Sequence, residues 1–136
     1  MLREHPEIAV YWTDQLPAGM RGCTDGSAIW MRTGMRQRER RATVAHELVH
    51  ILLGHSDEQP PAVEAYVRHQ VARWLLPDLR AVIDSIIFHA GDLLETARDL
   101  WVDETTVSIR LDPAFMTPDE RTYYMDRLAD LHHRGA

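Results

Sequence analysis

The sequence predicts an α+β fold, in which a small N-terminal antiparallel sheet or hairpin is followed by a helical bundle. A β-branched and aromatic stretch near the N-terminus predicts the sheet, and segments bounded by Gly, Pro and capping residues predict the helices. With 136 residues, the chain is typical of a single domain. Within it we expect a small sheet in residues 1–35, metal-site helices in residues 36–77 and an acidic helical part in residues 78–136.

Two strands are predicted in the first 35 residues. Residues 8–13 (IAVYWT) are β-branched and aromatic and lie between prolines. Residues 28–31 predict the second strand, because the Asp25-Gly26 pair before them is typical of a tight turn. Further turns are marked by Gly19 and Gly22. We therefore expect two strands in an antiparallel pairing, with the intervening residues in turns.

The helical part begins near residue 36. The first helix contains no Gly or Pro and ends at Gly54, and Pro77 ends the second helix. The last helix begins with a capping box that runs from Thr117 to Glu120 and has proline at the first helical position. The expected helices cover residues 37–53, 60–76, 78–89, 92–100, 103–111 and 117–132.

The basic residues of the chain exclude several mechanisms. All 15 of them are arginine, and there is no lysine. Walker-A phosphate binding, Schiff-base chemistry and Ser-Lys dyads each require a lysine, so we exclude them. The single cysteine, Cys23, cannot form an internal disulfide, which is typical of a reducing compartment. We expect Cys23 to lie in a turn, away from any metal site.

Charge is distributed unevenly along the chain. Residues 1–73 hold nine arginines and nine acidic residues, whereas residues 74–136 hold six arginines and twelve acidic residues, which accounts for the net charge of −6. Such an acidic half repels a phosphate backbone, so we expect no direct nucleic-acid binding. The N-terminal residues lack the apolar segment of a signal peptide, and no apolar stretch approaches the roughly 20 residues of a membrane span. These features predict a soluble, cytoplasmic protein without membrane contact.

The strongest chemical signal is the segment His46-Glu47-Leu48-Val49-His50. On a helix its two histidines stand about 40° apart on one face, so that both imidazoles can reach one Zn²⁺ ion. Zinc binds neutral imidazole and carboxylate ligands. Glu47 lies about 100° from His46, beside the metal and not on it, where a general base belongs. The alternative is a pair of hydrogen-bonded core histidines next to a solvated glutamate.

A third protein ligand decides the kind of metal site. Glu64 is the best candidate, because on the following helix it is centred on an apolar stripe, where a carboxylate without a partner is costly. The alternative for Glu64 is an ion pair with Arg68, one turn further along. His55 has the wrong spacing, and on a continued helix it would point about 140° away from His50. Weaker candidates for the third ligand are Asp57, Glu58 and His69.

Together these features resemble the ImmA/IrrE family of metallo-endopeptidases in its compact form. The resemblance covers about residues 15–112 and combines the histidine motif with a glutamate fourteen residues after His50 and an Ala-Arg-Trp-Leu-Leu-Pro helix end. Many relatives have Gly before the second histidine, where this chain has Val49. The matching segments are residues 16–22, 40–50, 64–67, 71–77, 93–104 and 110–111.

The resemblance implies a regulatory protease that cuts a specific protein, often a helix-turn-helix repressor. It implies zinc held by His46, His50 and Glu64, with Glu47 as the catalytic base for a water molecule activated by the metal. The partner we expect is therefore a protein substrate, specifically a transcriptional repressor. The alternative function is a non-catalytic zinc-containing module that binds a protein on the same scaffold.

Two supporting roles in the site have several candidates. A zincin ordinarily has a second donor for the developing oxyanion, and the two histidine rings need hydrogen-bond acceptors that orient them. Residue type alone does not select among them. The candidate donors are Tyr66, Arg68, His69 and His89, and the candidate acceptors are Asp99 and Asp103.

Overall fold

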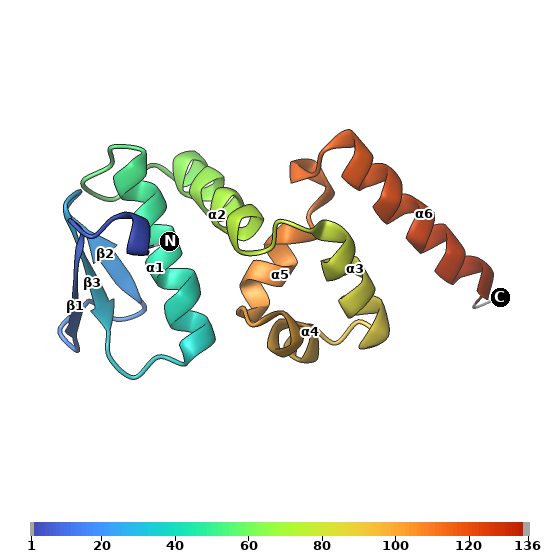
Figure 1. Ribbon diagram of the computed structural model, residues 1–136, viewed down its shortest axis with the longest axis horizontal. Helices are drawn as coiled ribbons and strands as arrows, with labels where there is room; N and C mark the ends of the chain where they lie inside the picture. Colours follow the sequence, from blue (N-terminus) through green and yellow to red (C-terminus); the bar gives the residue numbers. More distant parts are fainter. Residues whose placement is uncertain (1, 135–136) are drawn as a thin grey trace. The chain divides into compact units, whose positions relative to one another are not determined.

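The computed structural model describes residues 2–134 as a small sheet followed by helices, so the predicted α+β fold class is confirmed (Figure 1). The strands are β1 (Ala9–Thr13), β2 (Gly22–Thr24) and β3 (Ala28–Arg32). The helices are α1 (Gln37–Leu52), α2 (Pro61–Leu75), α3 (Leu79–Phe88), α4 (Leu93–Leu100), α5 (Glu104–Arg110) and α6 (Pro118–Arg134). Short 3-10 turns, η1 (Leu2–Glu4) and η2 (Pro113–Phe115), precede β1 and α6.

The chain forms two compact units, and the boundary between them falls within α2. The first unit ends at Val71 and the second begins at Ala72. The sheet, α1 and most of α2 belong to the first unit, and α3 to α6 belong to the second. That the chain is a single domain stays a prediction. Across the described residues, no helix has both the length and the apolar character that crossing a bilayer requires.

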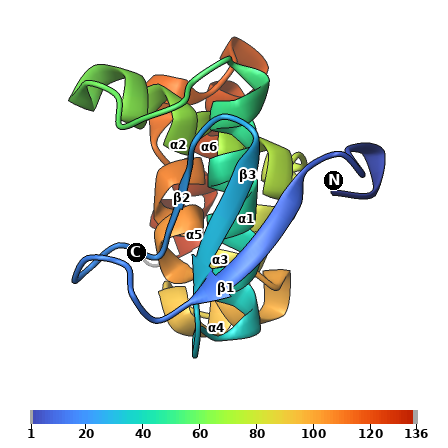
Figure 2. The same cartoon turned by 90° about the vertical axis from the view of Figure 1, so that its left-hand side faces the viewer.

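Strand β3 lies at the centre of a three-stranded sheet with the order β1–β3–β2 (Figure 2). β2 pairs with β3 in the antiparallel direction, with Gly22 opposite Met31. β1, however, pairs with β3 in parallel, with Ala9 opposite Ala28. The sheet is therefore mixed, which corrects the expected wholly antiparallel pairing.

Strand β2 lies where the sequence predicts turns. It has only three residues and begins with glycine, so it carries little strand signal. β2 reverses the chain between β1 and β3, and β3 therefore runs parallel to β1. β3 takes the centre because Ile29 and Met31 are almost completely buried, whereas the residues of β1 stay partly or largely exposed.

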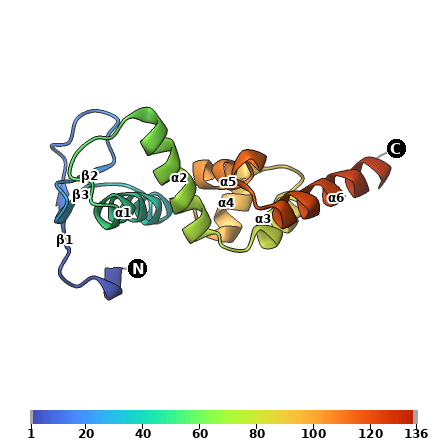
Figure 3. The ribbon, with the colours of Figure 1, turned by 90° about the horizontal axis from the view of Figure 1, so that it is seen from above.

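Helix α1 covers one face of the sheet (Figure 3) and forms the core of the first unit with it. Ile29, Met31 and Leu48 are buried at the centre of this contact. Partly buried apolar side chains pack around them, namely Leu2, Ile8, Val10, Met35, Val44 and Ile51. This packing fixes the rotation of α1 about its axis, and so determines which of its polar side chains face α2.

The second unit is built from α3 to α6. Its core consists of apolar side chains, of which Val102 and Val107 are completely buried. An aspartate caps the N-terminus of each of α3, α4 and α5; Asp92, for example, accepts a hydrogen bond from the N–H of Glu95 at 3.0 Å. The helices predicted in residues 78–132 are therefore confirmed, with bounds that differ by one or two residues.

Candidate metal centre

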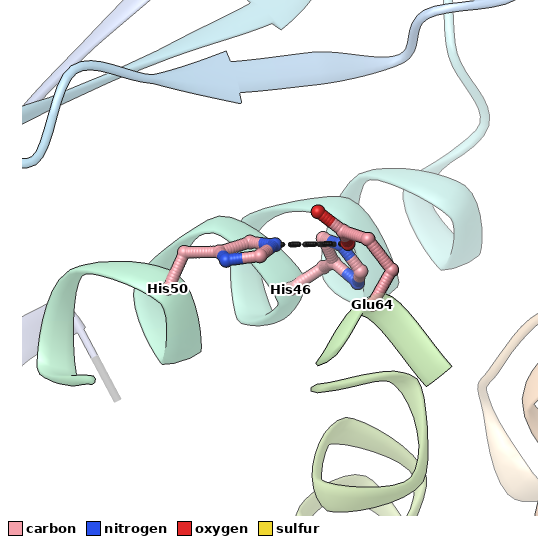
Figure 4. A group of neighbouring side chains, drawn as sticks. All are labelled: His46, His50 and Glu64. Carbon is pink, nitrogen blue, oxygen red and sulfur yellow. Dashed lines mark hydrogen bonds and ion pairs between the residues drawn. The ribbon is translucent and has the colours of Figure 1, made fainter. Parts of the chain in front are cut away.

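Three side chains from α1 and α2 converge in the first unit (Figure 4). His46 Nε2 and His50 Nε2 lie 3.2 Å apart, and Glu64 Oε2 lies 3.2 Å from the former and 3.1 Å from the latter. The histidines occupy successive turns of α1, and Glu64 lies in the first turn of α2. The structure thus brings together the three predicted metal ligands.

The spacing of the three ligand atoms fits a metal ion. Zinc–ligand distances are about 2.0–2.2 Å, so two ligands of a tetrahedral ion lie about 3.3–3.6 Å apart. The distances of 3.1–3.2 Å found here are close to that separation. Electron-rich atoms this close together need a cation or shared protons between them, because their lone pairs repel one another. The group can therefore hold a metal ion.

Glu64 is held in place by the loop that joins α1 to α2. Its Oε1 accepts a hydrogen bond from the backbone N–H of Gln59 at 3.2 Å, which leaves Oε2 directed at the histidines. Burial alone would raise the pKa of Glu64, but the Gln59 N–H and the two imidazoles outweigh burial and lower this pKa. The carboxyl group is therefore ionised near neutral pH, which is the form that binds a metal.

His46 is in the protonation state that metal binding needs. Burial is the main cause that lowers the pKa of His46, and the neighbouring His50 lowers it further. The Glu64 carboxylate opposes this shift and raises the pKa of His46, whereas the charge of Arg68 lowers it. His46 is thus neutral near pH 7 and has a lone pair available for a metal. His50 is more buried still, with 5% of its surface exposed.

Glu47 is buried on α1. The alternative of a solvated glutamate would require this side chain to be exposed. Only 8% of its surface is accessible. Burial, and to a lesser extent the charge of Glu64, raises the pKa of Glu47 to about 7. A carboxyl group with this pKa accepts and releases a proton readily at neutral pH, which is the property that a general base needs.

Strand β2 passes close to Glu47 because its first residue has no side chain. A Cβ atom on Gly22 would lie 2.8 Å from Thr43 Cγ2 and 3.5 Å from Glu47 Cγ. Cys23 follows Gly22 on the same strand, and burial first and the Glu47 charge second raise the pKa of its thiol. Cys23 therefore lies on a strand near the site, which corrects its expected place in a distant turn. It is not among the residues that can hold the ion.

The weaker candidates for the third ligand do not join the group. Within the part of the chain that the structure describes, one set of three or more His, Cys, Asp or Glu side chains has its ligand atoms within 4.8 Å of one another, and that set is His46, His50 and Glu64. Asp57, Glu58 and His69 lie outside it.

The predicted acceptors for the histidine rings serve the second unit instead. Asp99 accepts a hydrogen bond from the Ser85 hydroxyl at 2.7 Å, which connects α4 to α3. Asp103 accepts a hydrogen bond from the N–H of Thr106 at 2.9 Å and caps α5. Both carboxylates thus stabilise helix ends and helix contacts in the second unit.

The candidate oxyanion donors fall into two groups. Tyr66, Arg68 and His69 lie on α2 in the same unit as the site, and the charge of Arg68 lowers the pKa of His46. His89 belongs to the second unit, where its Nε2 lies 3.5 Å from a carboxylate oxygen of Asp99. The charge of Arg68 thus acts on one of the three metal-ligand candidates, and His89 makes its contact within the second unit.

His55 is a neighbour of the site that the spacing argument missed. Its Nδ1 lies 2.9 Å from His50 Nδ1. The expectation that His55 points away assumes a continued helix, but α1 ends at Leu52 and Gly54 turns the chain back with a φ of +79°. Glycine after a helix is the sequence signal for such a return.

Comparisons with known proteins assign no family to this geometry. No protein-family model, no curated protein and no solved structure matches the chain. The resemblance to the ImmA/IrrE family therefore stays a prediction.

Proposed function

We propose that this chain is a zinc-dependent endopeptidase. The observation that carries the proposal is the buried Glu47, with its pKa raised to about 7, beside a group of two imidazoles and one carboxylate. Three protein ligands of this kind are typical of catalytic zinc sites, whereas structural zinc sites ordinarily have four. Bound zinc would lower the pKa of water to about 7 and polarise a substrate carbonyl.

The residues of the chain have distinct tasks in peptide hydrolysis. His46, His50 and Glu64 would hold the ion. Glu47 accepts a proton from the water molecule whose oxygen forms the new bond to the peptide carbonyl carbon. When the C–N bond breaks, the same carboxyl group donates that proton to the leaving amine nitrogen, so Glu47 ends the cycle as it began. A pKa near 7 suits both transfers.

An extended peptide segment is the form of substrate that the site favours. β2 is an edge strand of the sheet and passes beside Glu47 at Gly22. A peptide can add to such an edge through main-chain hydrogen bonds, which would bring a peptide bond alongside Glu47. The resemblance to the ImmA/IrrE family supports a specific protein substrate, such as a helix-turn-helix transcriptional repressor.

The test compares the wild type with Glu47→Gln. Both proteins are loaded with zinc, their metal content is measured by elemental mass spectrometry, and cleavage of a proteome-derived peptide library is followed by mass spectrometry. We expect one zinc ion per chain in both proteins. We expect Glu47→Gln to lose about 10²–10⁴-fold in cleavage rate, because glutamine cannot accept the proton.

Glu58→Gln is the matched control, since it removes an exposed carboxylate of the α1–α2 loop that lies outside the metal group. This variant should cleave at the wild-type rate. Zinc binding without cleavage, or equal rates for Glu47→Gln and the wild type, would contradict the proposal. That outcome would favour the alternative, a non-catalytic zinc-containing module that binds a protein.

A further inference from the structure

The ring of His50 has a polar neighbour on the side away from the metal group. His50 Nε2 faces His46 and Glu64, while His50 Nδ1 lies 2.9 Å from His55 Nδ1. The two ring centroids are 5.2 Å apart, and the ring planes are tilted by 54°. With 5% of its surface exposed, His50 has little access to water, so its Nδ1 depends on His55 for a hydrogen bond.

The end of α1 places His55 at this position. The N–H of His55 donates to the carbonyl of His50 at 2.8 Å, and the N–H of Gly54 donates to that of Ile51 at 3.0 Å. These two bonds, with the left-handed Gly54, form a Schellman motif. In this motif the second residue after the C-cap, which is Leu53, packs against the helix residue five positions earlier, here His55 against His50. The contact between the two rings follows from that geometry.

The turn between β2 and β3 supports the same loop from the other side. A Cβ atom on Gly26 would lie 3.3 Å from Ser56 Cβ and 3.5 Å from the His55 carbonyl oxygen. Gly26 also has a φ of +98°, which favours glycine. The loop after α1 is therefore held between its own helix end and the sheet, so His55 has a defined position.

Hydrogen-bond chemistry restricts which tautomers allow metal binding. A neutral imidazole carries one proton, so His50 can offer Nε2 to a metal only when its proton is on Nδ1. The proton on Nδ1 then needs an acceptor, and His55 Nδ1 is placed to accept it. His55 in turn carries its own proton on Nε2. With the roles reversed, the proton of His50 would sit on Nε2 and block the metal.

We propose that His55 is a positioning residue of the metal centre, which accepts the Nδ1 proton of His50 and thereby holds His50 in its metal-binding tautomer. The inference rests on the proposed metal site but not on peptide hydrolysis. The α1–α2 loop thus supports two of the three ligands, because His55 contacts His50 and the N–H of Gln59 donates to Glu64. Such outer partners orient a ligand before the ion arrives.

The experiment measures zinc affinity by competition with a chromophoric chelator, with zinc alone as the probe. We expect His55→Ala to bind zinc about 10–100-fold more weakly than the wild type. His55→Asn should restore most of the affinity, because its side-chain oxygen can accept a hydrogen bond where the ring Nδ1 accepts one. His5→Ala, which removes a partly buried histidine of the same unit outside the metal group, should bind zinc like the wild type.

A second readout separates positioning from general damage to the fold. In the zinc-loaded wild type and in His55→Asn, nitrogen NMR of the imidazole rings should show His50 with a proton on Nδ1 that exchanges slowly with water. In His55→Ala that proton should exchange rapidly, while the thermal unfolding of the metal-free protein stays close to that of the wild type. Wild-type affinity in His55→Ala, or equally weak binding by His55→Asn, would overturn the inference.

These outcomes are independent of proteolysis. A chain that binds zinc but cleaves no peptide would contradict the proposed endopeptidase and leave the role of His55 intact. A wild type that binds no zinc would overturn both.

Discussion

The two glutamates of the site respond to their surroundings in opposite directions. Burial and the charge of Glu64 raise the pKa of Glu47 to about 7. Burial also acts on Glu64, but the Gln59 N–H and the two imidazoles lower the pKa of its carboxyl group. Carboxyl groups with separated pKa values are typical of sites in which one group keeps its charge and the other transfers a proton. At the residue scale, this division of roles supports Glu64 as a ligand and Glu47 as a base.

Glu64→Gln should weaken zinc binding strongly, because it removes the anionic ligand of the group. We expect an affinity loss larger than the roughly 10–100-fold that loss of an outer partner costs. Glutamine has nearly the same size and still accepts a hydrogen bond from the N–H of Gln59, so the metal-free fold should persist. Chelator competition measures the affinity, and circular dichroism checks the fold.

Glu58, an exposed carboxylate in the loop between α1 and α2, provides the control for the loss of a negative charge near Glu64. Glu58→Gln should leave the zinc affinity unchanged, since Glu58 lies outside the metal group. Equal affinities for Glu64→Gln and the wild type would show that the Glu64 carboxylate is not a ligand.

At the scale of elements, the closeness of β2 to α1 depends on one missing side chain. A methyl group on Gly22 would meet Thr43 Cγ2 at 2.8 Å and the Trp30 carbonyl oxygen at 3.1 Å. Gly22→Ala should therefore lower the free energy of unfolding by about 1–3 kcal/mol, as overpacking does. Urea unfolding of the metal-free protein measures this loss. Because β2 lies against Glu47, peptide cleavage should fall as well.

Thr43→Ser tests the cause of that loss. This substitution removes Cγ2 and keeps the hydroxyl group, which lies 3.8 Å from Met35 Sδ. In the double variant, the cost of Gly22→Ala should be smaller than in the single variant. Strictly additive free energies would show that the clash with Thr43 is not the reason.

The bounds of most helices could be predicted, whereas the strand pairing could not. Helix ends depend on local signals such as Gly54, Pro77 and the capping Asp92, which act within a few residues of the chain. The strand β2 has too few residues to show an alternating pattern. Its neighbour β3 becomes the central strand through burial against α1, which is a property of packing and not of any local segment.

At the scale of the whole molecule, the acidic bias of the second half has a structural use. Aspartates at the N-termini of α3, α4, α5 and η2 accept hydrogen bonds from backbone N–H groups. Glu120 on α6 accepts hydrogen bonds from Arg73 and from the buried Arg110. Arg110 also donates a hydrogen bond to the carbonyl of Leu76 at 2.7 Å. Negative charge in this half thus caps helices and connects α6 to α5.

Glu120→Gln should remove part of the acid sensitivity of the chain. Burial alone would raise the pKa of Glu120, but hydrogen bonds from Arg110, from the Thr117 N–H and from Arg73 lower it from 4.5 to about 2. The folded chain therefore binds fewer protons than the unfolded chain between these values, and its stability decreases as the pH falls through them. We expect Glu120→Gln to cost about 2 kcal/mol of unfolding free energy at neutral pH and progressively less in acid.

Urea unfolding at a series of pH values between neutrality and about 2 checks this expectation. Asp119→Asn, which changes the exposed acid next to Glu120, should keep the pH dependence of the wild type. Parallel curves for Glu120→Gln and the wild type would contradict the role given to Glu120.

The sequence by itself determined the α+β class, most helix bounds, and the placement of His46 and His50 on one face of a helix, because these depend on local periodicity and capping. Only the tertiary structure decided that Glu64 meets both imidazoles, that His55 reaches back to His50, and that β2 lies against Glu47. Those distances join residues that lie on different elements or across a helix end. Gly54 signals that the chain turns back after α1, but the distances themselves depend on how the loop and α2 then pack and on how α1 packs against the sheet, which no local pattern in the sequence encodes.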